Sequence, residues 1–259
     1  VIIMEFADEI KNGLNTKYIG KKIYHFAEVD STNDMAKKLA DKCEDGTVVI
    51  ADVQKRGKGR FGREWISPSG GIYLSIFLKP RMDPSNAPRL TLTFGLAVAK
   101  TIRKLGLDAK IKWPNDILIN GKKVSGILTE ADVNNNINYI IAGIGIDANV
   151  DIDTFPIELQ DSATSLNREL KKPVNRVELI RELLEEIEKY YDIYFQDYHK
   201  ILDEWRSLSD TIGRVVEIKT QKELIIGEAV GVDLEGELLV ELSDGTLKKI
   251  IAGECIYME

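Results

Sequence analysis

The stretch QKRGKGRFGREW, residues 54–65, carries the strongest signal in this sequence. Its glycines, Gly57, Gly59 and Gly62, follow the spacing G-x-G-x-x-G that is typical of loops around nucleotide phosphates. The loop is also strongly basic, with five cations within nine residues: Lys55, Arg56, Lys58, Arg60 and Arg63. Positive charge on a glycine-rich chain favours binding to an anionic ligand. A flexible loop with solvated charges is the plain alternative.

The residues around these glycines exclude the common nucleotide loops. Residues 47–53, TVVIADV, predict a buried strand, but residues 65–71 contain Ser-Pro and Gly-Gly and therefore predict a turn. A dinucleotide-binding loop needs a helix at that point. A kinase loop needs a later H-R-D motif, which the sequence lacks. A P-loop needs Gly-Lys-Ser/Thr where this chain has Gly62-Arg63.

The composition indicates a soluble globular protein of one or two domains. The chain has 259 residues, of which 44% are hydrophobic and 30% are charged, and its net charge is −7. This acidic balance argues against a general nucleic-acid or membrane-surface binder. The sequence has no apolar run of about 18 residues and no signal peptide, and its two cysteines and two histidines are isolated. We therefore expect a cytoplasmic protein without a disulfide framework, zinc site or membrane span.

The hydrophobic periodicity predicts an α+β fold, with a mixed or antiparallel sheet, flanking helices and no βαβ unit. Strands are expected at residues 21–29, 47–53, 72–80, 110–113, 116–120, 124–131 and 137–148. Helices are expected at residues 31–42, with Ser31 or Thr32 as the cap, and at 87–105, 175–194 and 201–208. Asn120-Gly121 predicts a tight hairpin turn, and Asn134 to Asn136 a looser one.

The last fifty residues predict a separate small unit. Short alternating strands are expected at residues 215–220, 224–232, 237–242 and 246–251, with turns at Glu235-Gly236 and Asp244-Gly245. Such a pattern is typical of a small β-barrel. We therefore expect one domain at residues 1–209 and a small β-barrel domain at residues 210–259.

Two further stretches place polar residues beside strand ends. KWPNDILINGKKVSGILTE, residues 112–130, sets Lys112, Asn115 and Asp116 around a Trp-Pro turn and puts Lys123 on the returning strand. Gly126 would allow a ligand to approach that strand closely. The plain alternative is a pair of turns with solvent-facing lysines. GIGIDAN, residues 143–149, has glycines inside a strand, which predicts either close backbone contact or a bulge.

Three motifs in this order resemble the biotin protein ligase family. They are Ser31-Thr32-Asn33, then Gln54-x-x-Gly57-x-Gly59-Arg60-x-Gly62-Arg63-x-Trp65-x-Ser67-Pro68, then Lys112-Trp113-Pro114-Asn115-Asp116 followed by Lys123-x-x-Gly126. The resemblance covers nearly the whole chain and implies that the C-terminal barrel is SH3-like. It implies that biotin and ATP give biotinyl-5′-AMP and pyrophosphate. Biotin would then pass to a lysine of a biotin carboxyl carrier domain, as in acetyl-CoA carboxylase.

The resemblance also implies a role for each matching residue. Lys123 and Arg60 would be catalytic, because fixed cations let the biotin carboxylate approach the α-phosphate of ATP. Biotin is assigned to Ser31, Thr32, Asn33, Gln54, Gly57, Lys58, Gly59, Arg60, Lys123 and Gly126. ATP is assigned to Arg60, Arg63, Trp65, Asn115, Asp116, Lys123 and Asn149. Asp116 would also contact Mg²⁺.

Two residues depart from the family pattern. Lys58 stands where the family loop has its first arginine, so the charge is kept but the planar two-point contact of a guanidinium is lost. Asp147 replaces the first asparagine of G-x-G-x-N-x-N, and an acid there either favours a metal or is structural.

Some family members carry an N-terminal DNA-binding domain. Thirty residues before Ser31 are too few for one, so we expect a monofunctional ligase that binds no DNA. Family members are often dimers, so the resemblance also implies a homodimer.

Two rival functions remain. A lipoate or octanoate ligase would share the fold, but the arginine-glycine loop disfavours it. A non-catalytic interaction module, with nucleic acid as its partner, is disfavoured by the net charge of −7.

Overall fold

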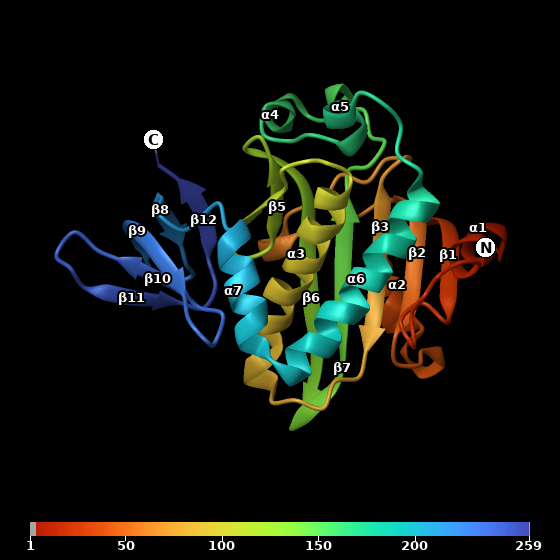
Figure 1. Ribbon diagram of the computed structural model, residues 1–259, viewed down its shortest axis with the longest axis horizontal. Helices are drawn as coiled ribbons and strands as arrows, with labels where there is room; N and C mark the ends of the chain where they lie inside the picture. The colour runs from red at the N-terminus through yellow and green to blue at the C-terminus, as the bar shows by residue number, and fades with distance from the viewer. Residues whose placement is uncertain (1–3, 259) are drawn as a thin grey trace.

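The computed structural model describes residues 4–258 and is built around a seven-stranded mixed sheet (Figure 1). The strands lie in the order β1-β2-β3-β7-β6-β5-β4. Their bounds are β1 Ile23–Val29, β2 Thr47–Gln54, β3 Ile72–Leu78, β4 Lys110–Lys112, β5 Asp116–Ile119, β6 Lys122–Asn134 and β7 Asn136–Ile146. The expected α+β fold with a mixed sheet is confirmed.

Helices cover both faces of this sheet. Their bounds are α1 Met4–Lys11, α2 Thr32–Lys38, α3 Ala87–Lys104, α4 Ile157–Gln160, α5 Leu166–Leu170, α6 Arg176–Gln196 and α7 Tyr198–Leu208. Short 3₁₀ turns occur at Ala40–Lys42, Arg60–Gly62, Pro84–Asn86 and Ile152–Thr154. The long helices α3 and α6 pack against each other in front of the sheet, and α2 packs on β2 and β3 (Figure 1). No helix within residues 4–258 combines the length and hydrophobicity needed to cross a membrane.

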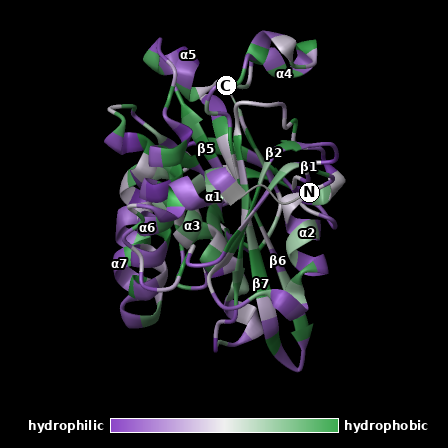
Figure 2. Ribbon diagram, turned by 90° about the vertical axis from the view of Figure 1, so that its right-hand side faces the viewer, coloured by the Kyte–Doolittle hydropathy of each residue, from purple (hydrophilic) through white to green (hydrophobic). Residues whose placement is uncertain are grey.

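Alternation along β7 divides its side chains between the two faces. Ile140, Ala142, Ile144 and Ile146 join the large core under α3 and α6, whereas Ile141 joins a smaller core under α2. The next positions on the α2 face are two glycines, so hydrophobic packing stops there and the face opens. Figure 2 shows the hydrophobic residues running along β6 and β7 between the helix layers.

The N-terminal part of the sheet corrects one expectation. We predicted no βαβ unit, and this was wrong, because β1 and β2 pair in parallel and α2 connects them. The predicted helix through Lys42 was too long. It is capped by the Ser31 hydroxyl as expected, but it ends at Lys38, where Leu39 leaves the α-helical conformation. The helix α1 was missed.

The hairpin between β6 and β7 is also tighter than predicted. Asn134 pairs with Asn136, and Asn135 alone turns the chain with a φ of 62°. Asparagine tolerates this left-handed conformation better than most residues, so it can close so short a turn.

The C-terminal residues form a second sheet beside α7 (Figure 1). Its five antiparallel strands lie in the order β11-β10-β9-β8-β12. Their bounds are β8 Val215–Lys219, β9 Leu224–Val232, β10 Leu238–Glu241, β11 Leu247–Ile250 and β12 Glu254–Tyr257. Strand β12 was not predicted, because its pairing with β8 is set by tertiary packing rather than by local sequence. Within residues 4–258 no ladder joins the edge strands β11 and β12, so this unit is an antiparallel sheet rather than a closed barrel.

Trp113 fixes the second sheet to the first. Its side chain is buried, its backbone N–H donates to Thr211 Oγ1 at 2.9 Å, and its indole N–H donates to the Gly236 carbonyl at 3.3 Å. The turn of the KWPND motif therefore joins the main sheet to the C-terminal unit.

Candidate functional site

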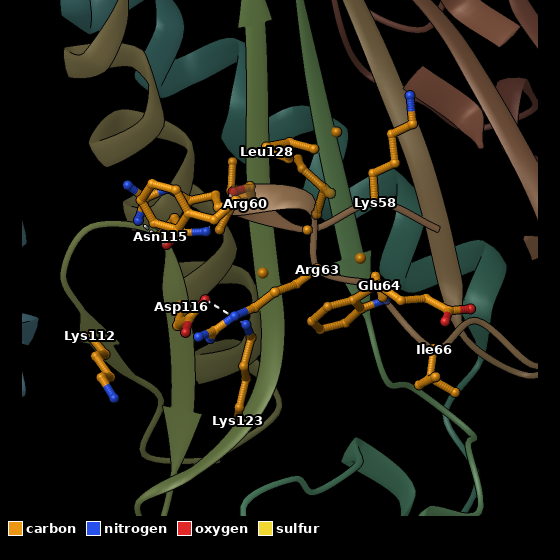
Figure 3. A pocket seen from close by; sticks show the side chains of 18 of the residues that line it. Lys58, Arg60, Arg63, Glu64, Ile66, Lys112, Asn115, Asp116, Lys123 and Leu128 are labelled. Atoms are coloured by element: carbon orange, nitrogen blue, oxygen red, sulfur yellow. Dashed lines mark hydrogen bonds and ion pairs between the residues drawn. The ribbon is translucent and has the colours of Figure 1, made fainter. Parts of the chain in front are cut away.

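A cavity of about 360 Å³ opens on the α2 face of the main sheet. It is lined by the start of α2, the loop 54–66, the facing parts of β5, β6 and β7, strand β12 and four residues that follow β7, which are Phe155, Leu159, Ser162 and Ala163. Polar side chains from the loop and from β5 and β6 point toward one another across it (Figure 3). All three motifs of the sequence meet in this cavity.

One end of the cavity is a buried network of neutral polar side chains. Gln54 Oε1 accepts from the Thr32 backbone N–H at 2.8 Å and from its hydroxyl at 3.1 Å, while Gln54 Nε2 donates to Ser67 Oγ at 2.9 Å. Ser75 Oγ lies 2.8 Å from Thr32 Oγ1 and 2.6 Å from Asn33 Oδ1. Each amide is therefore held in one orientation, which fixes where the network can donate and accept.

The Asn33 amide is held from a second side. Its Nδ2 donates to Glu130 Oε2 at 2.7 Å, and Glu130 Oε1 pairs with Lys37 Nζ at 2.6 Å. Ser31 keeps its role as helix cap, since its hydroxyl accepts from the Asp34 N–H at 3.5 Å. The cap and the cavity lining are thus compatible roles of the same serine.

The glycines of β7 leave space for the side chains of Asn33 and Trp65, which lie against the cavity face of the sheet. A Cβ on Gly143 would lie 2.3 Å from Asn33 Oδ1, and one on Gly145 would lie 2.6 Å from Trp65 Nε1. Gly126 on β6 is similar, with Trp65 Cζ3 at 3.1 Å from its hypothetical Cβ. The ladders on both sides of these glycines run without a bulge, so close approach is the correct interpretation of GIGIDAN.

The basic loop forms a small hairpin. Gly59 N donates to the Arg63 carbonyl at 2.8 Å, and Trp65 N donates to the Gly57 carbonyl at 2.8 Å. Phe61 and Gly62 turn the chain with φ values of 57° and 73°. Of the three motif glycines, only Gly62 has the positive φ that the turn requires. Gly57 is needed for space, because a Cβ added at residue 57 would lie 2.3 Å from the Trp65 carbonyl oxygen.

Two arginines attach this hairpin to the second sheet. Arg60 donates to Asn115 Oδ1 and to the Gly253 carbonyl, both at 3.3 Å. Burial lowers the pKa of the Arg60 guanidinium, and the negative charge of Asp116 opposes that shift. Arg63 pairs with Glu254 Oε1 at 2.5 Å and thereby lowers the pKa of that carboxyl. The loop bridges the two sheets over the cavity.

Lys123 is one of the residues that line the cavity. Its Nζ is 2.7 Å from Asp116 Oδ1, and it also lies 5.1 Å from the centre of the Trp65 ring (Figure 3). The backbone of Lys123 is fixed from outside the sheet: its N–H donates to the Ser162 carbonyl, and its carbonyl accepts from the Thr164 N–H, both at 2.8 Å. The ammonium group is thus held on a short, rigid hairpin.

Most of the predicted site residues line the cavity. The cavity lining includes Ser31, Thr32, Asn33, Gln54, Lys58, Gly59, Arg60, Arg63, Trp65, Asn115, Asp116, Lys123 and Gly126. Gly57 lies just behind it, under Trp65 and Ser67. Asn149 lies elsewhere, with its side-chain amide paired to the Val174 backbone at 2.8 and 2.9 Å. Lys58 points away to Asp34, at 2.6 Å.

Sequence analysis missed several neighbours of the site. Ser75 and Glu130 hold Asn33, and residues 253–256 supply one wall. Glu130 ends the stretch 112–130 but matches none of the family motifs, and Ser75 and residues 253–256 lie outside those motifs. Cys255 is part of that wall, and burial raises the pKa of its thiol to about 11, which keeps it protonated and unreactive at neutral pH.

Comparison with known proteins agrees with this geometry. Residues 25–147 match the Biotin/lipoate A/B protein ligase family, and residues 211–258 match the Biotin protein ligase C terminal domain. The chain is 39% identical to the bifunctional ligase/repressor BirA of Bacillus spizizenii over 95% of its own length and 77% of that protein. The chain belongs to the biotin protein ligase family.

Two further relatives in this family extend the comparison. A Mycobacterium tuberculosis protein named biotin–[acetyl-CoA-carboxylase] ligase is 29% identical over 90% of this chain and 87% of its own. The biotin protein ligase of Aquifex aeolicus in complex with biotin and ATP superposes with a TM-score of 0.80 and 30% identity, covering 92% of this chain and 99% of that one. This biotin protein ligase therefore shares its fold with a relative that holds both small substrates.

Proposed function

We propose that this protein is an ATP-dependent biotin–protein ligase. Biotin's carboxylate attacks the α-phosphate of ATP to give biotinyl-5′-AMP, and pyrophosphate leaves. A lysine amine of an acceptor protein then attacks the biotinyl carbonyl, so that AMP leaves and the amine loses a proton. The observation that carries this proposal is that one cavity brings together the neutral polar network, the basic loop and Lys123.

The first half-reaction brings two anions together. Like charges about 4 Å apart repel by roughly 4 kcal/mol at an effective dielectric constant near 20. Lys123 and Arg60 supply fixed positive charge that offsets this repulsion, and partial burial of Arg60 strengthens its effect. We assign Lys123 to the bridge between the biotin carboxylate and the α-phosphate, and Arg60 to the same region from the loop side.

The neutral network suits the ureido ring of biotin. A ureido group has two N–H donors and one carbonyl acceptor, and the oriented groups of Ser31, Thr32, Asn33 and Gln54 can satisfy them. A ligand without these groups leaves buried polar atoms unpaired, at a cost of about 1–3 kcal/mol each. We therefore expect selection against lipoate and octanoate. The match of residues 211–258 to the biotin protein ligase C-terminal domain favours the same choice.

The nucleotide lies on the loop side in this proposal. We assign Arg63 to the ATP phosphates, Trp65 to the adenine and Asn115 and Asp116 to the remaining nucleotide contacts. In the present geometry Trp65 lies against the glycines of β6 and β7, so an adenine contact requires the indole to move or the base to approach it there. Asn149 would have to give up its bonds to Val174 to reach ATP.

The carboxylate of Asp116 fits a Mg²⁺ ion that arrives with ATP. Mg²⁺ is commonly held by one or two carboxylates together with substrate phosphates, and Asp116 faces the cavity beside the amide of Asn115. Bound there, the ion would supply positive charge to the phosphates. Asp116 would then release Lys123, which it pairs with at 2.7 Å.

Other expectations are part of the proposal. The acceptor is a biotin carboxyl carrier domain of a carboxylase, as the name of the Mycobacterium tuberculosis relative suggests. Free, buried Cys43 and Cys255 favour a cytoplasmic setting, and the net charge of −7 disfavours binding to operator DNA. We further propose a homodimer, and a boundary between domains at residues 1–209 and 210–259.

Transfer of biotin to an acceptor tests the proposed function. The full-length protein is incubated with a biotin carboxyl carrier domain, biotin and MgATP, and the mass of the acceptor is measured. We expect one biotinyl group on a single acceptor lysine, only when ATP is present. A parallel incubation replaces biotin with lipoate or octanoate. An acceptor that gains lipoate or octanoate as readily as biotin, or that gains no biotin, contradicts the proposal.

A further inference from the structure

Asp147 is a buried carboxyl group that the reaction described above does not use. Asp147 lines the cavity, but only 3% of its surface is exposed to solvent. Within residues 4–258 its side chain forms no hydrogen bond, and Oδ1 is fully enclosed without a partner. Buried polar atoms are nearly always paired, so an unpaired carboxyl aimed into a binding cavity points to a ligand.

The backbone prevents this carboxyl from turning to solvent. Asp147 N donates to the Val124 carbonyl at 2.9 Å, and the Asp147 carbonyl accepts from the Leu166 N–H at 2.8 Å. Asp147 directly follows β7, and it lines the same cavity as Gly143 and Gly145 of that strand. The group therefore stays in the cavity.

Among residues 4–258, no cation forms an ion pair with Asp147. Lys123 on β6 is a positive charge that acts on Asp147, but Asp116 already holds its ammonium group at 2.7 Å. Tyr73 on β3 also faces Asp147, but its hydroxyl donates to the Pro68 carbonyl and burial raises its pKa. Arg176, beyond Tyr73, pairs with Asp52. The packed segment 164–167 carries only neutral side chains.

We propose that Asp147 acts in this site as a neutral carboxylic acid that donates a hydrogen bond to a ligand oxygen next to Lys123. The inference rests on the proposed function, in which that oxygen belongs to the biotin carboxylate or to the α-phosphate. An ionised Asp147 would repel either anion and compete with it for Lys123. A neutral acid adds a donor without adding charge.

Burial acts in the direction that this role needs. It raises the pKa of Asp147 well above its usual value, while the charge of Lys123 opposes the shift only in part. The neutral form therefore persists to higher pH than for an exposed aspartate. Once the pH passes the raised pKa, the donor is lost and a negative charge appears beside the bound anion.

The pH dependence of adenylation distinguishes this role from a structural one. We would measure kcat/KM for biotin-dependent ATP–pyrophosphate exchange, from acid to alkaline pH, for the wild type, Asp147→Asn and Asp161→Asn. Asparagine keeps an N–H donor but cannot ionise, and Asp161 is an exposed control from the segment bordering the cavity. We expect the wild type and Asp161→Asn to lose about tenfold per pH unit on an alkaline limb, and Asp147→Asn to lack that limb.

An infrared spectrum gives a second readout that does not depend on activity. In D₂O at neutral pH, a protonated carboxylic acid has a carbonyl band apart from ionised carboxylates. We expect this band in the wild type and Asp161→Asn and its loss in Asp147→Asn. An unchanged alkaline limb in Asp147→Asn, or a wild-type spectrum identical to that variant's, would overturn the inference. A wild type without biotin-dependent exchange would instead refute the proposed function, and the infrared comparison would still decide the state of Asp147.

Discussion

Lys123 Nζ lies 2.7 Å from Asp116 Oδ1, across the hairpin that joins β5 to β6. The two residues belong to different halves of the stretch KWPNDILINGKKVSG, and the Asn120-Gly121 turn brings them together. The pair is partly exposed to the cavity, so its own contribution to stability is small. Its importance is electrostatic, because an incoming phosphate or carboxylate must take Lys123 from Asp116.

Replacing Lys123 should therefore affect chemistry more than folding. We expect Lys123→Ala to lower the rate of adenylate formation at least ~10²-fold, the scale of losing one fixed donor of charge stabilisation. Lys122→Ala is the matched control, since Lys122 is exposed one residue earlier on the same strand. Single-turnover formation of biotinyl-AMP measures the effect. Similar rates of biotinyl-AMP formation in the two variants would show that Lys123 does not take part in adenylation.

The attachment of the basic loop to β12 predicts a lid. Arg60 joins the hairpin to the Gly253 carbonyl, and a closed loop would shield the adenylate from water. We expect Arg60→Gly to release biotinyl-AMP early and to cause untargeted labelling of added protein lysines. Arg56→Gly, which also removes a loop cation but at an exposed position, should keep the adenylate. Equal release by both variants would contradict the lid.

Trypsin gives an independent view of the same loop. Ordering glycine residues costs about 1–2 kcal/mol of backbone entropy each. The ion pairs of Lys58 and Arg63 that attach the loop are partly exposed and therefore hold it only weakly. We expect trypsin to cut the free enzyme first between Lys55 and Arg63, and biotin with ATP to protect these bonds. Cleavage at the same rate with and without the substrates would argue against ligand-induced closure.

The glycines of β7 should not tolerate a side chain. A Cβ at residue 143 would lie 2.3 Å from Asn33 Oδ1, and one at residue 145 would lie 2.6 Å from Trp65 Nε1. We expect Gly143→Ala and Gly145→Ala to lose about 1–3 kcal/mol of unfolding free energy, as overpacked sites do, and to bind biotin more weakly. Gly231→Ala is the control, because its nearest neighbour would be Leu239 at 3.8 Å. Urea unfolding measures the free energy of unfolding, and calorimetry measures biotin binding. Equal losses of unfolding free energy in all three variants would contradict this prediction.

The sequence predicted the parts of the fold whose patterns are local. Long helices such as α3 and α6 were found because their hydrophobic residues repeat at helical spacing and Asn175 caps α6. Strand β12 and the parallel pairing of β1 with β2 were missed, because pairing partners are chosen by tertiary packing rather than by local sequence.

In the candidate site, too, local motifs were predicted and contacts between distant segments were not. The motifs predicted which residues meet around Lys123, but they could not show that Trp65 would lie on Gly145 or that residues 253–256 would form a wall. Asn149 was assigned by its motif, whereas the structure pairs it with Val174, in a part of the chain that no motif marks. Contacts between distant segments carry no signature in a single sequence.

Stability should respond to pH through Asp147. Its folded-state pKa is raised, so above the usual aspartate pKa the unfolded chain binds fewer protons than the folded one. This group therefore destabilises the fold progressively as pH rises from about 4 toward the raised value. We expect the Tm of Asp147→Asn to exceed that of the wild type by a margin that grows over this range. A margin independent of pH would show that the carboxyl ionises normally.

Biotin-dependent exchange of pyrophosphate into ATP tests the central claim most directly, because it reports adenylation without any acceptor protein. The wild-type enzyme with MgATP and labelled pyrophosphate should form labelled ATP when biotin is added. It should form little when lipoate or octanoate replaces biotin, and Lys123→Ala should lower the biotin-dependent rate. A rate of pyrophosphate exchange that does not change when biotin is added, or that is equally high with lipoate, would contradict the assignment of this cavity to biotin adenylation.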